Sequence, residues 1–384
     1  MRRIAILLAA IVAGVLVATG VGIAASSSDS QQQTSSVEKD TKVTVMTRNV
    51  YHGVDAEFAQ AIAAPDFRTF LTATAAVYNG YHQRNFPERA DALAAEIEAT
   101  HPDVVGLQEA IKVRTDRPPN GTPPLAEQVS LDYLLILLDK LQARGLHYEP
   151  VVQRDNFDIE VPADENSDGT PDFELRHTDR VAMLVRTDPD LKVLGTNSGH
   201  FQTNCTLPTR AAGGITILRG WTSVDLSVRG KAVRLINTHL DGDCMDPPVS
   251  NPNIQLAQAR EILQGPVQKA RDQGLPVILL GDLNSKADGS GTQTYAELLK
   301  PKVGFADAWT GGGSGAGLTC CQDDDLLNSA SKLTDRRDYV LFSRGPFQVV
   351  GAQVVGADPI TTPSGLRWPS DHAGVVAKLR FPPE

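Results

Sequence analysis

The chain has 384 residues, of which 41% are hydrophobic and 21% charged, so it can bury a large core and does not have the composition of a disordered protein. Its formal net charge of -10 leaves no basic surface for wrapping a polyanion, which argues against a tight nucleic-acid-binding protein. The same charge does not exclude an enzyme that meets nucleic acid only locally, through a metal ion.

The N-terminus has the pattern of an export signal. Arg2 and Arg3 precede a long apolar run that ends in small residues. We expect residues 1–25 to be a signal peptide or, because the run is long, an uncleaved membrane anchor. Residues 26–40 are rich in Ser and Gln, which predicts a flexible spacer. Residues 41–384 would then form the working domain, either secreted or tethered to the outer face of the membrane.

The first part of this domain alternates between predicted strands and helices. A strand over 42–47 leads to Asn49, and a short buried strand over 104–108 leads to Glu109. Helices are predicted over the Ala-rich 55–80, over 87–100 and over 131–144, with a Pro-rich loop over 114–124. An amide or an acid therefore stands at the end of each of the first two strands.

Residues 153–179 predict a polar insertion that contains a calcium-loop pattern. Oxygen-bearing side chains alternate along it, with Gly169 in the sixth place, but Leu175 stands where such a loop has its last acid. The ligands would be Asp164, Asn166, Asp168 and Asp172. Two interpretations stay open, a structural calcium site and a solvated acidic turn.

The second part of the domain continues the pattern of strands that border on polar side chains. Strands are predicted over 181–185, 215–227, 232–240, 275–280 and 336–342, with a last strand after residue 372 and helices over 254–273 and 293–300. His239 and Asp282 end two of these strands, whereas Asp338 and His372 precede two others. Four strands of the domain therefore end in polar residues, and two begin with them.

The buried strand over 275–280 carries the clearest signal. Asp282 and Asn284 follow it two positions apart, so they leave the strand on the same side and can converge on one small group. Alone, this stretch would be interpreted as a turn whose side chains bond their own backbone. Because ligands of open α/β sheets bind at the carboxyl ends of strands, and several strands here end alike, we predict an active site instead.

The four cysteines allow three disulfide pairings. Cys205 and Cys244 border what the pattern predicts to be adjacent strands, which favours a bond between them. Cys320 and Cys321 would close only a strained ring with each other, and bridging elsewhere is the alternative. The chain has no C-x-x-C spacing, so a zinc site is not expected.

Six short motifs, taken together and in order, resemble the endonuclease/exonuclease/phosphatase superfamily of DNase-I-like proteins. They are Thr47–Val50, Leu107–Glu109, Asn237–Leu240, Gly281–Asn284, Arg337–Val340 and Ser370–His372. The resemblance covers residues 42–381. It implies an α/β (α+β) fold that is a four-layer sandwich, with two packed mixed β-sheets flanked by helices.

The resemblance also implies a metal-dependent site. Glu109, helped by Asn49 and with Asp371 nearby, would hold magnesium, or manganese in its place, because these ions take few protein oxygens and keep several waters. His52 and Asp55 stand where some nucleases keep a further acid, which leaves a second metal ligand open.

The remaining motif residues suit hydrolysis of a phosphate ester by activated water. Asp282 would orient and deprotonate the water, and Asn284 would hold that water or a phosphate oxygen. His372 would be partnered by Asp338, and His239 would donate to a phosphate oxygen. For Arg180 there are two interpretations: it faces the phosphate, or it pairs with Asp179. No covalent nucleophile is needed.

We therefore expect a secreted, magnesium-dependent hydrolase of phosphate esters, in the first place a phosphodiesterase or endonuclease. The alternatives are a sphingomyelinase-type phospholipase C, an inositol or other small-molecule phosphatase and, from another class, a non-catalytic binding module. The substrate could be nucleic acid, phospholipid or a small molecule, and the sequence indicates no obligatory protein partner.

Overall fold

The computed structural model describes residues 41–121, 125–210, 213–244 and 249–382. All of them belong to one compact unit, Asp40–Glu384. The predicted signal peptide or anchor (1–25) and the predicted spacer (26–40) lie outside the described residues. Within those residues, no helix combines the length and the apolar character needed to cross a membrane.

Two large mixed β-sheets form the frame of this unit. Among the described residues, the first sheet has eight strands, ordered β15-β18-β1-β2-β6-β3-β4 with β5 paired to β6. These strands are β1 (Lys42–Asn49), β2 (Val104–Gln108), β3 (Lys112–Asp116), β4 (Gln128–Asp132), β5 (Tyr148–Ala163), β6 (Phe173–Arg186), β15 (Gln348–Val355) and β18 (Gly374–Arg380).

The second sheet has six strands in the described part of the chain, ordered β13-β14-β12-β11-β10-β7. They are β7 (Leu191–His200), β10 (Gly220–Val228), β11 (Lys231–His239), β12 (Val277–Asp282), β13 (Phe305–Asp307) and β14 (Asp338–Ser343). Two short hairpins accompany the sheets, β8 (Cys205–Thr209) with β9 (Gly213–Ile217) and β16 (Ile360–Thr362) with β17 (Gly365–Arg367).

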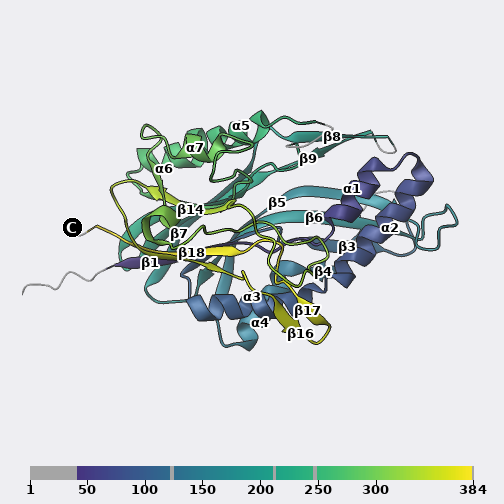
Figure 1. The fold of residues 1–384 in the computed structure, drawn as a ribbon, viewed down its shortest axis with the longest axis horizontal. Helices are drawn as coiled ribbons and strands as arrows, with labels where there is room; N and C mark the ends of the chain where they lie inside the picture. Colours follow the sequence, from purple (N-terminus) through teal and green to yellow (C-terminus); the bar gives the residue numbers. More distant parts are fainter. Residues whose placement is uncertain (1–40, 122–124, 211–212, 245–248, 383–384) are drawn as a thin grey trace, which may run out of the picture. The chain divides into compact units, whose positions relative to one another are not determined.

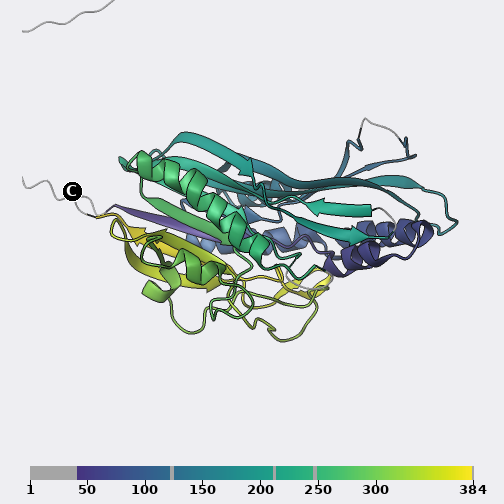
Figure 2. The same ribbon diagram turned by 90° about the horizontal axis from the view of Figure 1, so that it is seen from above.

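Helices cover the outer faces of both sheets. They are α1 (Asp55–Ala63), α2 (Phe67–Gln83), α3 (Phe86–Thr100), α4 (Tyr133–Ala143), α5 (Asn253–Ile262), α6 (Gln268–Asp272), α7 (Thr294–Leu298) and α8 (Ala308–Gly312). A π-helical turn, η1 (Leu263–Val267), joins α5 to α6 and contains Pro266, so the predicted helix over 254–273 is one continuous segment. Figures 1 and 2 show α3 and α4 on one side of the sheets and α5 to α7 on the other.

Alternating side chains divide the apolar core into layers. Along β12, Ile278 and Leu280 pack between the two sheets, whereas Val277 and Leu279 pack outward against the helical layer of α5 to α7. On the far side of the first sheet, residues of α3 and α4 pack on outward residues of β1 and β2. This order of helix, sheet, sheet and helix confirms the predicted four-layer sandwich.

The same alternation decides where the polar strand ends point. Ile278, Leu280 and Asp282 are alternate residues of β12 and therefore point to the same face. The side chain of Asp282 thus lies on the inter-sheet side. Asn49, in register with Val43 and Val45, shares that side from the opposite sheet. These two side chains therefore lie together at one edge of the layer between the sheets, which we call the polar edge.

β11 and β12 run parallel and in close contact, with His239 opposite Asp282. Gly281 makes this approach feasible: its φ is +150°, and a Cβ atom there would lie 2.2 Å from the carbonyl oxygen of Thr238. A side chain at this position would push the two strands apart at the level of His239 and Asp282.

Asn237 joins the two sheets just below the polar edge. From β11, its side-chain nitrogen donates to the carbonyl oxygens of Leu107 (2.9 Å) and Ala182 (3.0 Å) in the first sheet. Its oxygen accepts a hydrogen bond of 2.6 Å from Gln108 Nε2. This fully buried amide fixes the position of one sheet relative to the other.

Some element predictions were wrong in detail. The predicted insertion over 153–179 consists mostly of the paired strands β5 and β6, because polar side chains alternate along an exposed strand. The predicted helix over 55–80 is broken at Pro65, and Asp66 caps the second helix by accepting from Thr69 N at 2.8 Å. The start of the predicted loop over 114–124 belongs to β3.

Candidate active site

Asp282 lies at the centre of the polar edge. Its Oδ2 is 3.1 Å from Asn49 Nδ2 and 3.6 Å from Nε2 of both His239 and His372. Its Oδ1 accepts from the backbone nitrogen of Asn284 at 2.8 Å. Burial alone would raise the pKa of Asp282, but the charge of His372 and these hydrogen bonds lower it, so the group is a carboxylate at neutral pH.

Backbone strain accompanies this arrangement. Glu109 and Asn284, which follow β2 and β12, have φ values of +56° and +49°, a left-handed conformation that residues other than glycine adopt at a cost of roughly 1 kcal/mol or more. In this conformation Glu109 contacts Asn49 and Asn284 contacts His239, so both side chains lie at the edge between the sheets.

His372 and Asp338 form the expected pair. His372 Nδ1 lies 2.8 Å from Asp338 Oδ2, and the other carboxylate oxygen of Asp338 is buried and accepts no hydrogen bond from any residue that the structure describes. Burial alone would lower the pKa of His372, but Asp338, Asp371 and Asp282 raise it well above its ordinary value. His372 is thus a protonated imidazole whose Nε2 faces Asp282.

His239, unlike His372, is neutral. Burial and the nearby charge of Arg219 lower its pKa to about 4, so the ring is neutral. Arg219 Nη1 lies 2.9 Å from His239 Nδ1, and because a guanidinium only donates, Nδ1 accepts and the ring proton is on Nε2. Nε2 lies 3.1 Å from Asn284 Nδ2 and 3.6 Å from Asp282 Oδ2, at the place where the predicted role of His239 requires a donor.

Sequence reasoning missed Arg219. It stands just before β10, outside the six motifs, and its Nη2 donates to Asp243 at 2.8 Å while Nη1 lies 3.7 Å from Asp179. A lone arginine ahead of a strand gives no sequence signal, since its contact with His239 depends on the pairing of β10 with β11.

Two of the predicted metal ligands, Asn49 and Glu109, are in direct contact, and the charge of Glu109 acts on the third, Asp371. Asn49 Nδ2 bridges Glu109 Oε1, at 2.9 Å, and the carboxylate of Asp282. Burial and the negative charges of Glu109 and Asp55 raise the pKa of Asp371 to about 7. Neighbouring carboxylates repel one another, and a hard divalent cation such as Mg²⁺ or Mn²⁺ would offset this repulsion while binding their oxygens.

His52 adds a positive charge beside this cluster. Its backbone nitrogen donates to Glu109 Oε2 at 2.7 Å, and its ring Nε2 lies 2.9 Å from Asp55 Oδ1. Burial alone would lower the pKa of His52, but Asp55 and Glu109 raise it to about 10. Asp55 is therefore engaged with His52.

Arg180 lies elsewhere than either interpretation placed it. Its guanidinium forms an ion pair of 2.5 Å with Asp132 and donates to the backbone oxygens of Ala110 and Ile111. The pairing with Asp179 was wrong, and the phosphate contact is not supported, because these buried partners occupy the guanidinium. Arg180 instead holds the backbone that follows Glu109.

The calcium-loop pattern forms the turn between β5 and β6. Its side chains accept hydrogen bonds from the turn's own backbone: Asp164 from Ser167 N and Gly169 N, both at 2.7 Å, and Asp172 from Glu165 N at 2.7 Å. These bonds are those of a self-stabilised acidic turn, one of the two interpretations, and calcium binding stays a prediction.

The cysteines form two bonds. Cys205 and Cys244 are joined, as predicted, with Cα atoms 5.7 Å apart. Cys320 pairs with its neighbour Cys321 instead of bridging elsewhere. Cys321 Sγ lies 3.6 Å from His372 Nε2, a contact with the site that no sequence pattern revealed.

Taken together, the four-layer sandwich and the His, Asp and Asn side chains at its inter-sheet edge define a hydrolase of the DNase-I-like class. A sequence model described as "Endonuclease/Exonuclease/phosphatase family" matches residues 50–372. The chain belongs to this family, whose members hydrolyse phosphate esters. Among curated proteins, none matches the sequence.

Solved structures share the fold at low sequence identity. A family member from Bacteroides thetaiotaomicron is 17% identical, with 90% of this chain and 99% of that chain covered and a TM-score of 0.54. A mannosyl-6-phosphatase from the same organism is also 17% identical, with 88% and 100% covered and a TM-score of 0.55. A humanized D. rerio TDP2 is 17% identical, with 88% and 98% covered and a TM-score of 0.50.

Proposed function

We propose that the protein is a secreted, metal-dependent phosphodiesterase that uses water as its nucleophile. The observation that carries the proposal is the ionised carboxylate of Asp282, which lies between two histidines in different charge states. His239 is neutral and His372 is protonated. A base beside two N–H donors is the arrangement that hydrolysis of a phosphate diester needs.

Each residue has a separate task in this proposal. Asp282 accepts the proton of the attacking water, while Nε2–H of His239 donates to a phosphate oxygen. His372, held by Asp338, stabilises the negative charge that develops or gives its proton to the leaving oxygen. The water oxygen bonds to phosphorus, one P–O ester bond breaks, and the products are a phosphate monoester and an alcohol.

Glu109, Asn49 and Asp371 would hold the divalent cation. When bound, such an ion polarises a phosphoryl oxygen and offsets charge in the transition state. Removal of the cation should therefore abolish turnover, whereas the histidine and aspartate contacts described above do not need it to form.

Two features support export. The N-terminal sequence has the pattern of a signal peptide, and the Cys205–Cys244 bond is of a kind that persists in oxidising compartments. Detection of the protein in culture medium, with residues 1–25 absent by mass spectrometry, would support secretion. Recovery of intact chain from the cell membrane would favour the anchored form instead.

The catalytic proposal is tested with a substrate panel. The purified protein is incubated with Mg²⁺ or Mn²⁺ and with plasmid DNA, RNA, sphingomyelin, inositol phosphates or bis-(p-nitrophenyl) phosphate, with and without EDTA. We expect hydrolysis of at least bis-(p-nitrophenyl) phosphate that stops on chelation and returns with added metal. Hydrolysis of none of the substrates, or hydrolysis that EDTA leaves unchanged, would overturn the proposal.

A further inference from the structure

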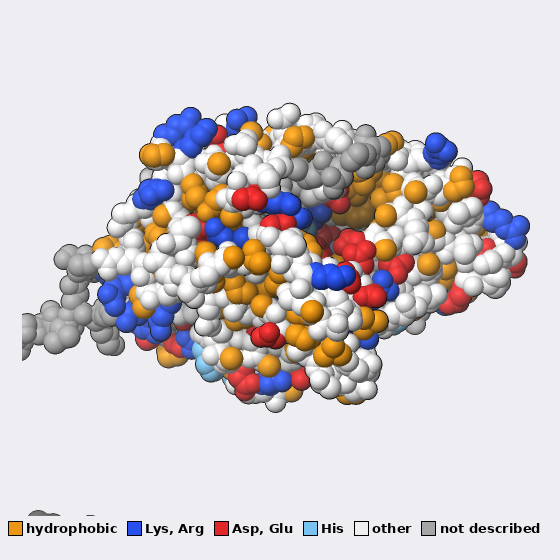
Figure 3. Space-filling model, in the orientation of Figure 1, with side chains coloured by type: hydrophobic (Ala, Val, Ile, Leu, Met, Phe, Trp, Pro, Cys, Tyr) orange, Lys and Arg blue, Asp and Glu red, His pale blue; other side chains and the backbone are white. Residues whose placement is uncertain are grey.

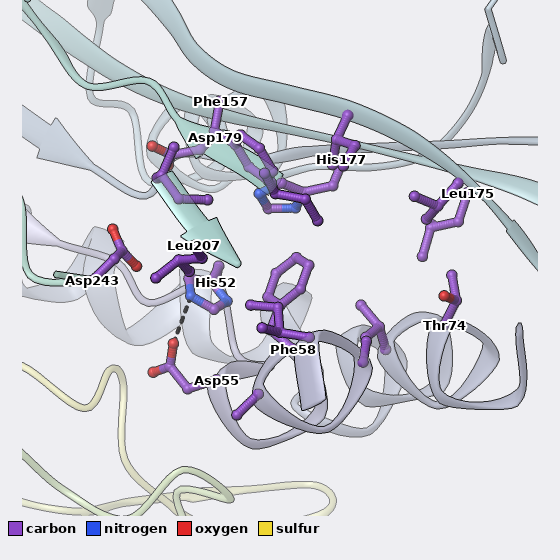
Figure 4. A pocket seen from close by; sticks show the side chains of 18 of the residues that line it. His52, Asp55, Phe58, Thr74, Phe157, Leu175, His177, Asp179, Leu207 and Asp243 are labelled. Carbon is purple, nitrogen blue, oxygen red and sulfur yellow. Dashed lines mark ion pairs between the residues drawn. The ribbon is translucent and has the colours of Figure 1, made fainter. Parts of the chain in front are cut away.

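A cavity of about 270 Å³ opens directly beside the active site. Residues of α1, α2, β5, β6 and the β8–β9 hairpin line it, and Figure 4 shows many of their side chains pointing into the same space. Glu109 and Arg219 belong to both the cavity lining and the active site. The cavity is therefore continuous with the place where the phosphate would bind.

The lining changes from charged to apolar away from the site. In Figure 4, Asp55 and Asp243 lie at one side of the cavity, whereas Leu175 lies at the other. Phe58 and Phe157 also line it, and their rings lie 5.1 and 6.0 Å from that of His177. The part distant from the phosphate site thus presents hydrocarbon surface.

His177 does not place a charge in this apolar part. Its Nδ1 lies 2.7 Å from the hydroxyl of Tyr81, and burial together with the charge of His52 lowers its pKa to about 3. With the imidazole neutral and hydrogen-bonded, hydrocarbon can pack against its ring without leaving an ion desolvated.

The size of the cavity suits a substantial hydrocarbon group. An apolar cavity of about 150 Å³ is large enough to bind benzene. The cavity here, about 270 Å³, has room for a larger group such as a substituted ring or an alkyl chain.

The charge around the opening disfavours a polyanion. Asp55, Asp179 and Asp243 line the cavity near Arg219 and His52. Figure 3 shows acidic side chains gathered beside a hollow with a hydrophobic floor on the same face. A nucleic acid would bring many phosphates to this surface, whereas a small amphiphilic ester brings one.

We propose that the cavity binds a hydrocarbon group attached to the scissile phosphate, so that the substrates are phosphate esters of an alkyl or aryl alcohol. This inference rests on the proposed function, since it assigns the substrate class of the same site. The histidines hold the phosphate beside Asp282, and the hydrocarbon part inserts between α1 and β6.

A series of p-nitrophenyl alkyl phosphates, from methyl to octyl, tests the proposal. In the wild type, kcat/KM should rise by roughly fourfold for each methylene group that enters the cavity, and level off when the cavity is full. A rate independent of chain length, or one that falls with it, would overturn the inference while leaving the proposed hydrolysis intact.

Two variants and a matched control connect this preference to the cavity. Ala61→Phe fills the cavity from α1 and should flatten the dependence on chain length, whereas Phe58→Ala enlarges it and should move the plateau to longer chains. Ala63→Phe makes the same change at an exposed position of α1 outside the lining and should behave as the wild type. An unchanged chain-length profile in both cavity variants would contradict the proposal.

Binding provides a readout that does not depend on turnover. By calorimetry, hexyl phosphate should bind the wild type at least tenfold more tightly than methyl phosphate does, and Ala61→Phe should remove the difference. Equal affinities in the wild type would refute the cavity assignment. An inactive protein that still shows the preference would refute the proposed function alone.

The source of the hydrocarbon group is distinguished by two further substrates. Dihexanoylphosphatidylcholine below its micellar concentration represents a lipid, and phenyl p-nitrophenyl phosphate represents a soluble aryl ester. Preferential hydrolysis of the first assigns a lipid and of the second an aryl ester, and either supports the inference. If Ala61→Phe changes the hydrolysis of neither substrate, the inference is wrong.

Discussion

Asp282 and His372 carry the proton transfers of the proposed reaction. Replacement of either by alanine should lower kcat by about a hundredfold or more, the scale of a lost acid or base group. The measurement is steady-state hydrolysis of bis-(p-nitrophenyl) phosphate by the purified variants. Asp358→Ala, an exposed acid away from the site, is the control. Near-normal turnover in either variant would remove that residue from its role.

Arg219 sets the charge state and the tautomer of His239. Because its positive charge helps burial to depress the pKa of His239, Arg219→Gln should raise that pKa from about 4 toward the ordinary value near 6.5. NMR titration of the histidine ring protons measures the shift, and kcat should fall roughly tenfold as the ring loses its fixed orientation.

Arg219→Lys is the matched control, since it keeps the positive charge and should keep the pKa low. If the glutamine variant titrates His239 as the wild type does, the contact between Arg219 and Nδ1 does not control the ring.

Among single residues, those at strand ends could be predicted from the sequence better than those that contact them from other parts of the chain. Asn49, His239, Asp282 and Asp338 were recognisable because each borders an apolar run. Arg219 and Cys321 were not, because their contacts with the histidines arise only when separate strands and loops are brought together. The pairing predicted between Arg180 and Asp179 was wrong because a buried acid distant in the sequence, Asp132, is the partner of Arg180.

At the scale of the elements, the site depends on the fixed spacing of the two sheets. Asn237→Ala should lower the free energy of unfolding by about 2 kcal/mol or more, because Gln108 and two backbone carbonyls lose a buried partner. Urea denaturation measures the change, and Asn197→Ala on the exposed face of β7 is a control that should have a small effect. Equal stabilities of the two variants would show that Asn237 does not join the sheets.

Strands that are buried on both faces were predicted correctly, whereas a strand with an exposed face was not. The strand that became β12 reads as an unbroken apolar run, so its nature was clear. β5 has charged and polar residues along most of its length, and only its pairing with β6 makes it a strand. The cavity between this pair and α1 and α2 was therefore not predictable either.

At the scale of the whole molecule, one covalent bond links the cavity wall to the active site. The Cys205–Cys244 bond closes a loop of 39 residues and joins β8, which carries Leu207 in the cavity lining, to the residue that follows Asp243. Replacing both cysteines by serine should lower the free energy of unfolding by roughly 4 kcal/mol, as the entropy of a loop of this length indicates. Denaturant titration of the double variant tests this, and an unchanged midpoint would contradict it.

The order of the layers was foreseeable from six motifs spread over the chain, because they resemble a family with one architecture. The family resemblance does not predict the structure of the segments between the motifs. The helices α1 and α2 and the β8–β9 hairpin lie in such stretches, and they supply the cavity that distinguishes possible substrates.

The disulfide between Cys205 and Cys244 also bears on how the protein is produced. A chain in which only Cys205 and Cys244 are reduced would share every catalytic side chain with the oxidised chain but lack this one bond. A mixed preparation would then contain two populations with similar kcat on the smallest ester and different KM on larger ones. Variation between batches in apparent selectivity, at constant turnover of the simplest substrate, would report incomplete oxidation and not impurity.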